Sequence, residues 1–153
     1  MARKNWAPST IWTLKQSNIR WHQSSNAAHA KLFLPKINSK QSEELCNLNR
    51  RKLRIITGFL TGHCCLNKFL YRIGKSTSPA CRVCKDPSST ENIEHFLSLC
   101  NNQEIQKMRL RHFSTPLLMK NEYHAVNHKN ILDFAYESGI YKCFFTRQND
   151  QSW

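Results

Sequence analysis

Three cysteines and one histidine in the second half of the chain have the spacing of a metal site. Cys81 and Cys84 form a C-x2-C pair, and His95 and Cys100 follow as an H-x4-C pair after ten intervening residues. Three thiolates and one imidazole make a complete tetrahedral shell for zinc, with no position left open for water. Because a closed shell is typical of structural sites, we expect one structural Zn2+ and no metal-assisted chemistry.

Two other interpretations of these cysteines are weaker than the zinc site. Buried free cysteines are common as small core hydrophobes, but that role requires no regular spacing. Disulfides need an oxidising compartment, whereas the odd number of cysteines, seven, and a polar start without an apolar core do not indicate export. We therefore expect an intracellular protein, cytoplasmic or nuclear and not secreted. No apolar run is long enough for a membrane span.

The second half of the shell is expected on a helix over residues 90–99. Thr90 is a favourable N-cap for that helix, and acidic residues in its first turn suit the helix dipole. Apolar residues follow at helical spacing, so that His95 would lie on the helix and Cys100 just beyond its end. The C-x2-C turn must then fold back onto this end for all four side chains to share one ion.

Positive charge is concentrated in the first half of the chain. The net charge is +13, and residues 1–75 hold 14 Lys and Arg against 2 Asp and Glu, a balance of +12. Residues 76–153 hold 9 against 8. A field of this sign attracts polyanions, of which nucleic acid is the commonest. The alternatives are a merely soluble basic surface and an anionic membrane, but no Lys-rich helix has the large apolar face of a membrane-binding helix.

Apolar periodicity predicts a mainly α fold, a small helical domain with a CCHC zinc site and low strand content. We divide the chain into three parts. Residues 1–41 form a basic N-terminal segment that contains tryptophans, residues 42–140 form the helical zinc-containing domain, and residues 141–153 form a polar tail.

The N-terminal segment allows two interpretations of its tryptophans. A short helix starting near Ser9 would carry Trp12 and Trp21. Exposed rings beside basic residues could stack on bases, as in single-strand binders. The alternative, which we favour, is that the rings pack on the domain. Residues 31–35 are expected to form a short extended piece that ends at Pro35.

Residues 42–61 carry the strongest helical pattern in the chain. Apolar residues fall on one broad arc, and Arg50, Arg51 and Arg54 fall on the opposite arc. An arginine face of this kind either contacts phosphates or is only solvated, and the pattern leaves both interpretations open. Gly62 is expected to end the helix, since glycine commonly follows a helix terminus.

Three more helices are predicted further along the chain. Residues 66–73 would form a hairpin with the preceding helix. Residues 103–113 and residues 130–136 also show helical periodicity. On the helix predicted over residues 103–113, Arg109 and Arg111 are expected to be polar residues at the surface.

Six short motifs follow one another between residues 60 and 100. They are Leu60-Thr-Gly-His63, Leu66-Asn-Lys-Phe-Leu70, Ile73-Gly74, Cys81-Arg-Val-Cys84, Glu91-Asn-Ile-Glu-His95 and Cys100. Together they resemble the carboxyl-terminal region of non-LTR retrotransposon polyproteins of the Jockey and I-factor type. In those proteins the region follows the reverse transcriptase and ribonuclease H domains. The resemblance covers about residues 19–140.

The resemblance places Cys81, Cys84, His95 and Cys100 at the family's metal-ligand positions. His63 matches the histidine of the family's L-T-G-H step. Because the shell of four ligands is already full, we expect this histidine to cap a helix end or to pack.

Two residues depart from the family pattern, and the second departure leaves metal binding untouched. Asn92 replaces the threonine of the E-T-x-x-H step, and Asn101 stands where the family often has proline. Catalytic residues are missing altogether. There is no paired-aspartate motif of a reverse transcriptase, and the first 75 residues hold only Glu43 and Glu44, whereas ribonuclease H needs four separated carboxylates. The resemblance therefore implies a non-catalytic fragment of such a polyprotein.

These observations predict a zinc-stabilised module that binds RNA or DNA largely through phosphates. The alternative is a structural or protein-interaction domain. In that case zinc only holds the helices together, and the domain docks other parts of the polyprotein to one another. An enzyme is the weakest hypothesis, since a zinc deaminase would need an H-x-E motif and a cysteine nucleophile next to His63 would rarely have the needed geometry. The phosphate contacts are expected from Arg50, Arg51, Arg54, Lys68 and Arg72.

Overall fold

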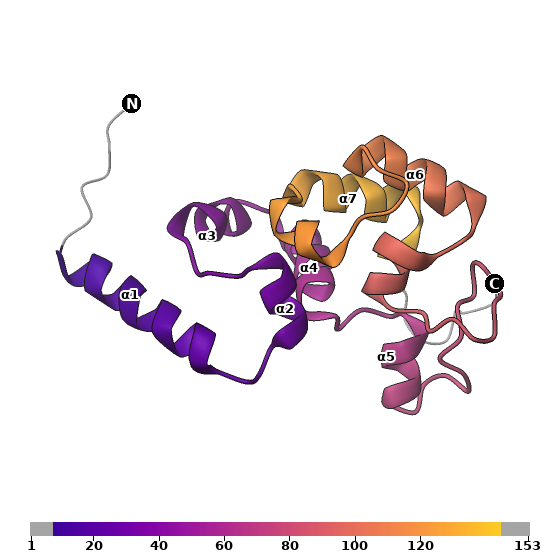
Figure 1. Ribbon diagram of the computed structural model, residues 1–153, viewed down its shortest axis with the longest axis horizontal. Helices are drawn as coiled ribbons and strands as arrows, with labels where there is room; N and C mark the ends of the chain where they lie inside the picture. Colours follow the sequence, from indigo (N-terminus) through magenta and orange to yellow (C-terminus); the bar gives the residue numbers. More distant parts are fainter. Residues whose placement is uncertain (1–7, 145–153) are drawn as a thin grey trace.

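The computed structural model describes residues 8–144 as helices joined by loops (Figure 1). Within that range the only β pairing is an isolated antiparallel bridge between Ala80 and Thr90. The predicted mainly α fold with low strand content is therefore confirmed. The elements are α1 (Pro8–Gln23), α2 (Ala28–Phe33), α3 (Ser39–Cys46), α4 (Arg50–Thr61), α5 (Asn67–Arg72), the π-helical turn η1 (His95–Leu99), α6 (Gln103–Phe113), the 3-10 helix η2 (Lys120–Ala125), α7 (His128–Glu137) and the 3-10 helix η3 (Ile140–Phe144).

Helix α4 is the centre of the hydrophobic core. Its first turn is set by Asn49, whose side chain accepts a hydrogen bond from the Lys52 amide at 3.0 Å. Ile55, Ile56 and Phe59 are completely buried, and the helix packs against α2 and α7. Burying each such side chain contributes about 1.5–3 kcal/mol, so α4 is the main support for its neighbours.

The prediction of a single helix over residues 42–61 is wrong, because this segment forms two helices. Helix α3 ends at Cys46, and the next amide, of Asn47, donates to the Glu43 carbonyl at 3.1 Å. Asn49 then starts α4 as a separate helix. The side chain of an asparagine such as Asn49 can take a backbone hydrogen bond that would otherwise continue a helix. The spacing of apolar residues carries no sign of this competition.

Two further predictions about local structure are wrong. Residues 31–35 are not an extended piece, because α2 continues to Phe33 and the chain leaves the helical conformation only at Leu34, the residue before Pro35. Proline restricts the residue that precedes it and leaves earlier residues free to be helical. The predicted hairpin also does not form, since α4 packs on α2 and α7 while α5 stands apart from it (Figure 1).

The carboxyl-terminal helices match their predictions closely. The helix predicted over residues 103–113 is α6, with the same bounds, and residues 130–136 lie within α7. These two helices pack on each other, with the ring centroids of Phe113 and Phe134 5.3 Å apart. They form the layer that covers α4 (Figure 1), because α7 packs against both α6 and α4.

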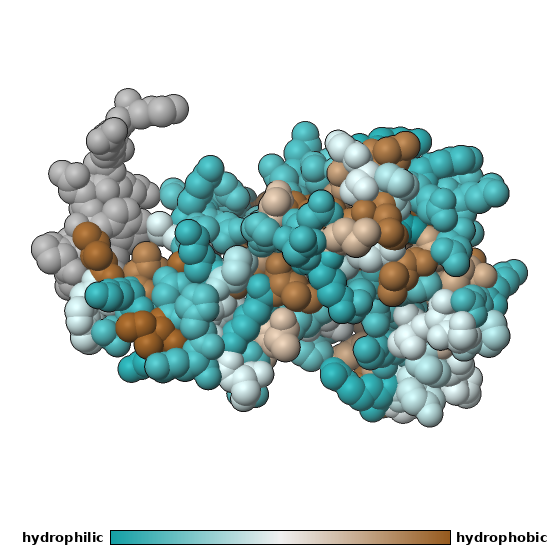
Figure 2. Space-filling model, in the orientation of Figure 1, coloured by the Kyte–Doolittle hydropathy of each residue, from teal (hydrophilic) through white to brown (hydrophobic). Residues whose placement is uncertain are grey.

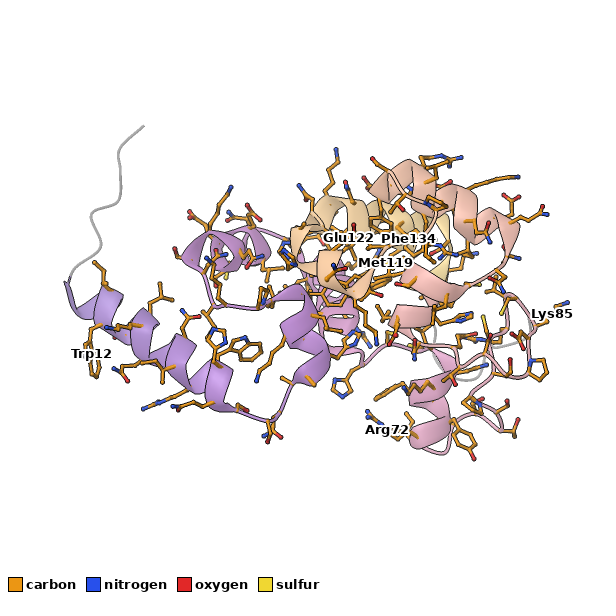
Figure 3. The ribbon with its side chains drawn as sticks, viewed as in Figure 1. Trp12, Arg72, Lys85, Met119, Glu122 and Phe134 are labelled. Carbon is orange, nitrogen blue, oxygen red and sulfur yellow. The ribbon has the colours of Figure 1, made fainter. Side chains whose placement is uncertain are left out.

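The tryptophans of the N-terminal segment have different surroundings. Trp21 donates its ring N–H to the Leu34 carbonyl at 2.9 Å, and the Lys31 ammonium lies 5.6 Å from the centroid of the same ring. Trp12 is 65% exposed and projects from α1 at one end of the molecule (Figure 3). Trp6 lies outside the described residues. Packing on the domain is thus confirmed for Trp21 and wrong for Trp12.

Hydrophobic residues reach the surface along α1 (Figure 2), where Ile11 and Ile19 are exposed. Asn18 attaches this helix to the domain by exchanging two hydrogen bonds with the backbone of Ile37, at 2.7 and 3.0 Å. None of the helices within residues 8–144 combines the length and the apolar character that crossing a bilayer requires. The last part of the predicted polar tail, residues 145–153, lies outside the described range.

Candidate metal centre

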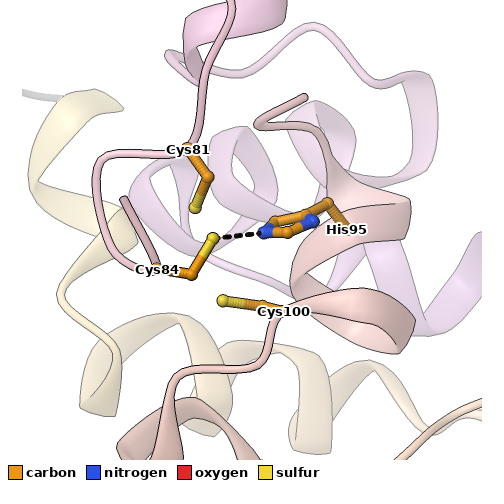
Figure 4. Close-up of side chains that lie close together, drawn as sticks. All are labelled: Cys81, Cys84, His95 and Cys100. Carbon is orange, nitrogen blue, oxygen red and sulfur yellow. Dashed lines mark hydrogen bonds between the residues drawn. The ribbon is translucent and has the colours of Figure 1, made fainter. Parts of the chain in front are cut away.

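The side chains of the four predicted ligands point toward one another (Figure 4). The donor atoms of Cys81, Cys84, His95 and Cys100 all lie within 4.8 Å of one another. The Cys84 sulfur is 3.4 Å from His95 Nε2. A tetrahedral zinc ion with bonds of about 2.0–2.3 Å separates its donors by about 3.5–3.8 Å. The group could therefore hold a metal ion after only small inward shifts.

The C-x2-C turn is held by its own backbone. The amides of Val83 and Cys84 donate to the Cys81 sulfur, while the Cys81 carbonyl accepts from the Lys85 amide at 3.0 Å. Lys85 has a positive φ of 56°, which closes the turn, and its side chain points outward (Figure 3). Amides that donate to a sulfur stabilise its thiolate form, which is the form that binds metal.

An exposed loop after the turn is ordered by one carboxylate. Asp86 accepts hydrogen bonds from the Ser88 amide and from the hydroxyls of Ser88 and Ser89. These hydrogen bonds lower the pKa of Asp86, and the bond from the Ser88 hydroxyl has the largest effect. The Ser89 carbonyl then accepts from the Cys81 amide at 3.0 Å. The loop thus fixes the backbone of the first ligand.

Glu91 ties the metal loop to helix α5. Its carboxylate is completely buried and accepts from the backbone amides of Asn67, at 3.0 Å, and Arg82, at 2.7 Å. The Arg82 guanidinium adds an ion pair at 2.6 Å. Asn67 completes the tie by donating its side-chain N–H to the Ala80 carbonyl at 2.7 Å. One carboxylate therefore joins the first turn of α5 to the residue inside the C-x2-C pair.

The helix predicted over residues 90–99 begins later than expected. Thr90 is not its N-cap, because it pairs with Ala80 in the β-bridge. The cap is Asn92, whose side chain accepts from the His95 amide at 2.7 Å. Asparagine is an effective N-cap, so the helix starts two residues later than the pattern predicted.

The placement of the second pair of ligands is confirmed. His95 is the first residue of the π-helical turn η1, and Cys100 follows its last residue. The Cys100 amide donates to the His95 carbonyl at 2.7 Å, a bond that spans five residues. This wider turn brings the cysteine back beneath the histidine, so both face the C-x2-C turn (Figure 4).

The protonation of the ligands suits a cation. A hydrogen bond between the Cys81 and Cys100 side chains raises the pKa of Cys81 and lowers the pKa of Cys100, so that Cys100 ionises first. Burial lowers the pKa of His95, which leaves its ring neutral and able to act as a ligand. A divalent ion would displace the remaining thiol protons.

The predicted nucleic-acid contacts fall into two groups. Lys68 and Arg72, on α5, line a groove of about 610 Å3 together with Phe69 and Tyr71. The opposite wall is the segment 90–94, which leads directly into the metal ligands. The Arg72 guanidinium lies 5.1 Å from the Phe69 ring centroid and at the edge of the molecule (Figure 3).

The other predicted contacts lie outside this groove. Arg50, Arg51 and Arg54 are exposed on the first two turns of α4. His63 follows α4, and the His63 and Phe69 rings meet edge to face with their centroids 5.4 Å apart. Of the two roles expected for this histidine, capping or packing, the structure shows packing. The structure thus brings two of the five basic residues together in the groove and leaves three outside it.

The sulfur next to His63 is poorly suited to nucleophilic chemistry. Cys64 is buried, and burial is the main reason that its pKa is raised to about 12. The thiolate, which is the reactive form, is then almost absent at neutral pH.

No family model matches this chain, and no curated protein or solved structure is significantly similar to it. The resemblance to the retrotransposon region therefore remains an expectation.

Two residues that position the centre were interpreted differently from the sequence. Glu91, one of the acidic residues expected in the first turn of the helix over residues 90–99, is instead a buried hydrogen-bond acceptor. Arg109 was placed as surface decoration, whereas it is 1% exposed beside Cys100. A signal for Arg109 was present, because it shares the helical stripe of Ile105 and His112 at spacings of four and three.

Proposed function

We propose that this chain is a non-catalytic module, stabilised by a zinc ion, that binds nucleic acid mainly through phosphate contacts. The observation that carries the proposal is the groove beside α5, where Lys68 and Arg72 face a wall that ends in the metal ligands. Glu91 fastens both walls to each other. The metal centre would therefore set the shape of a groove that presents Lys68 and Arg72, while the carboxylates of its other residues, Glu91 and Glu94, are paired with Arg82 and Lys120.

The chemistry of the groove suits a single strand. Lysine and arginine neutralise phosphates, and the exposed ring of Tyr71 offers a face on which a base can stack. Most of the chain's surplus positive charge, +12 over residues 1–75, lies in the half that supplies α4 and α5. That charge would attract a polyanion from a distance and leave selectivity to the groove.

Zinc fits the donor set better than harder cations do, because three sulfurs and one imidazole nitrogen are its usual structural ligands. Cys81, Cys84, His95 and Cys100 would hold it. When bound, the ion supplies folding free energy and leaves no position for a substrate. All other contributions, namely binding, stacking and positioning, come from the side chains of the chain itself.

The motif order supports an origin for the module. We propose that it derives from the carboxyl-terminal region of a non-LTR retrotransposon polyprotein, and that it acts inside the cell, in the cytoplasm or the nucleus. The partners would be the element's RNA or DNA and other parts of the same polyprotein. The neighbouring coding sequence tests this origin, since a reverse transcriptase frame upstream would support it.

Fluorescence anisotropy with labelled oligonucleotides tests nucleic-acid binding directly. Affinity should fall with salt, with a log–log slope of about −0.7 per phosphate contact on a single strand and about −0.9 on a duplex. The double variant Lys68→Ala with Arg72→Ala should weaken binding about tenfold or more and flatten the slope by about one to two units.

The matched control removes the same charge elsewhere. Lys107 and Lys129 are exposed and lie in the other half of the chain. Replacing both by alanine should change affinity much less than the groove variant does. Equal losses of affinity in the groove variant and the control variant would show that binding depends on overall charge and not on the groove. A wild-type chain that binds no oligonucleotide at low salt would overturn the proposal.

A protein-interaction domain is the second candidate, and the surface of α1 favours it. Ile11, Trp12 and Ile19 are exposed on this helix, and exposed apolar groups gathered on one element often mark a docking surface. In that case zinc would only hold the helices together. The chain would then show no anisotropy change with any oligonucleotide at low salt.

A further inference from the structure

Arg109 is a buried cation beside the metal centre. Only 1% of its surface is exposed. Its Nη2 donates to the carbonyl of Cys100, whereas its Nε and Nη1 find no hydrogen-bond partner within the described residues. A buried arginine that leaves two of its nitrogens unsatisfied is unusual and requires an explanation.

An unpaired guanidinium at this depth is costly. Arginine keeps its proton at any pH that the protein experiences, so it cannot escape burial by becoming neutral. The carboxylates that precede the His95–Cys100 pair are bound elsewhere, since Glu91 pairs with Arg82 and Glu94 pairs with Lys120. Within residues 8–144, no ion pair joins a carboxylate to Arg109. The compensating negative charge must therefore have another source.

The metal centre supplies a charge of the required sign. Three thiolates and a neutral imidazole around one Zn2+ sum to a net charge of −1. The guanidinium acts electrostatically on two of the four ligands, Cys100 and His95. We propose that Arg109 is the buried counter-cation of this metal–thiolate centre. This inference rests on the zinc site proposed above.

The arrangement couples metal binding to folding from both sides. With zinc bound, the cation and the anionic centre neutralise each other in a site from which water is excluded. Without zinc, nothing gathers the three sulfurs around one point, so the compact anionic centre beside Arg109 is lost and the buried guanidinium is left poorly compensated. Arg109 therefore strengthens the metal-bound form and weakens the metal-free form.

Zinc affinity measured against a chromophoric chelator tests the proposal. Arg109→Met keeps the length and apolar stem of the side chain and removes its charge. It should lower zinc affinity about 10–100-fold, the usual effect of losing a group that supports a metal site. Arg109→Lys keeps the charge and should lose less. Arg111→Met removes the same charge from an exposed position on the same helix and should leave the affinity within about twofold of the wild type.

A second measurement separates a counter-cation from a packing role. Denaturant unfolding of the chelated proteins should find Arg109→Met at least as stable as the wild type, because the unpaired charge is gone. If Arg109→Met does not fold, Arg109→Gln takes its place in both measurements. Equal zinc affinity in wild type and variant would overturn the inference while leaving the zinc site intact. Equal destabilisation of both forms would also overturn it. A wild-type protein that binds no zinc would overturn the zinc proposal itself, and this inference with it.

Discussion

At the scale of single residues, the metal loop depends on the carboxylate of Glu91. This group accepts from two backbone amides that belong to different elements, and also from Arg82. No backbone interaction of the C-x2-C turn could replace it, because the amide of Asn67 lies on α5. Removing its charge should loosen the loop and the helix together.

Glu91→Gln should lower the free energy of unfolding by about 2–4 kcal/mol, because a buried charge-assisted network loses its acceptor and Arg82 loses its partner. Urea unfolding measures this loss. Glu94→Gln is the matched control, because Glu94 pairs with Lys120 at the surface and should cost less than about 1 kcal/mol. Equal losses in the two variants would contradict the role given to Glu91.

A second residue-scale prediction concerns acid stability. His29 is half-buried, its Nε2 lies 2.9 Å from the Phe59 carbonyl, and its pKa is lowered, chiefly by burial. The folded chain therefore holds this ring neutral, whereas the unfolded chain takes up a proton as the pH falls below about 6.5. Stability is complete above that pH and declines as the pH falls toward the lowered pKa of the folded state.

His29→Gln should therefore show a smaller loss of stability between pH 7.5 and pH 5.5 than the wild type. The comparison of slopes isolates this ring, because the metal ligands titrate equally in both proteins. Urea midpoints at the two pH values provide the measurement. Parallel declines in both proteins would show that His29 does not contribute.

At the scale of elements, the end of α4 requires a glycine for two reasons. Gly62 has a φ of 71°, which is left-handed, and a Cβ at this position would lie 3.2 Å from the His29 ring. Gly74 has nearly the same φ, 70°, but no atom lies within 4 Å of where its Cβ would be. Comparing alanine substitutions at the two glycines therefore separates the cost of backbone strain from the cost of steric crowding.

Gly74→Ala should cost about 1–2 kcal/mol, the strain of a left-handed alanine. Gly62→Ala should cost more than that, because the ring of His29 must also move away from its carbonyl partner. Thermal unfolding of the two variants under one buffer condition measures the difference. A Gly62→Ala variant no less stable than Gly74→Ala would show that the ring adapts freely.

The sequence predicted elements well where a single periodicity extended over a whole helix. The bounds of α6 agree with its apolar pattern, and the four residues whose spacing predicted a metal site do lie close together. Failures occurred where a polar side chain competes for backbone groups. Asn49 divides a predicted helix, and Asn92 replaces Thr90 as a cap. Neither effect alters hydrophobic periodicity, so only the hydrogen bonds of the folded chain reveal it.

The residues that support the metal site were harder to predict than the ligands. Ligand types and spacing are read along the chain, but the partners of Glu91 lie 24 and 9 residues away. The burial of Arg109 depends on how α6 packs on the rest of the molecule. A charge on an apolar stripe is the one sequence signal that such a group leaves.

At the scale of the whole molecule, the two halves of the chain have different tasks. The first half supplies α4 and most of the positive charge, while the second half supplies the four residues that could hold a metal ion. They meet in the groove, whose walls come from both halves. Metal binding and polyanion binding should therefore be coupled.

Chelation of the metal should weaken oligonucleotide binding about tenfold or more, since the wall at residues 90–94 would lose its support. Anisotropy titrations of the same preparation before chelation, after chelation and after zinc is restored measure this effect. Restored zinc should recover the affinity. Affinity that is insensitive to chelation would show that the basic surface acts independently of the metal centre.

The central claim is that one zinc ion, held by Cys81, Cys84, His95 and Cys100, organises this fold. Elemental analysis of the purified, folded protein tests it most directly. We expect about one zinc per chain, and a Cys100→Ala variant that has lost it. A wild-type chain that shows full helical circular dichroism while containing essentially no metal would contradict the account.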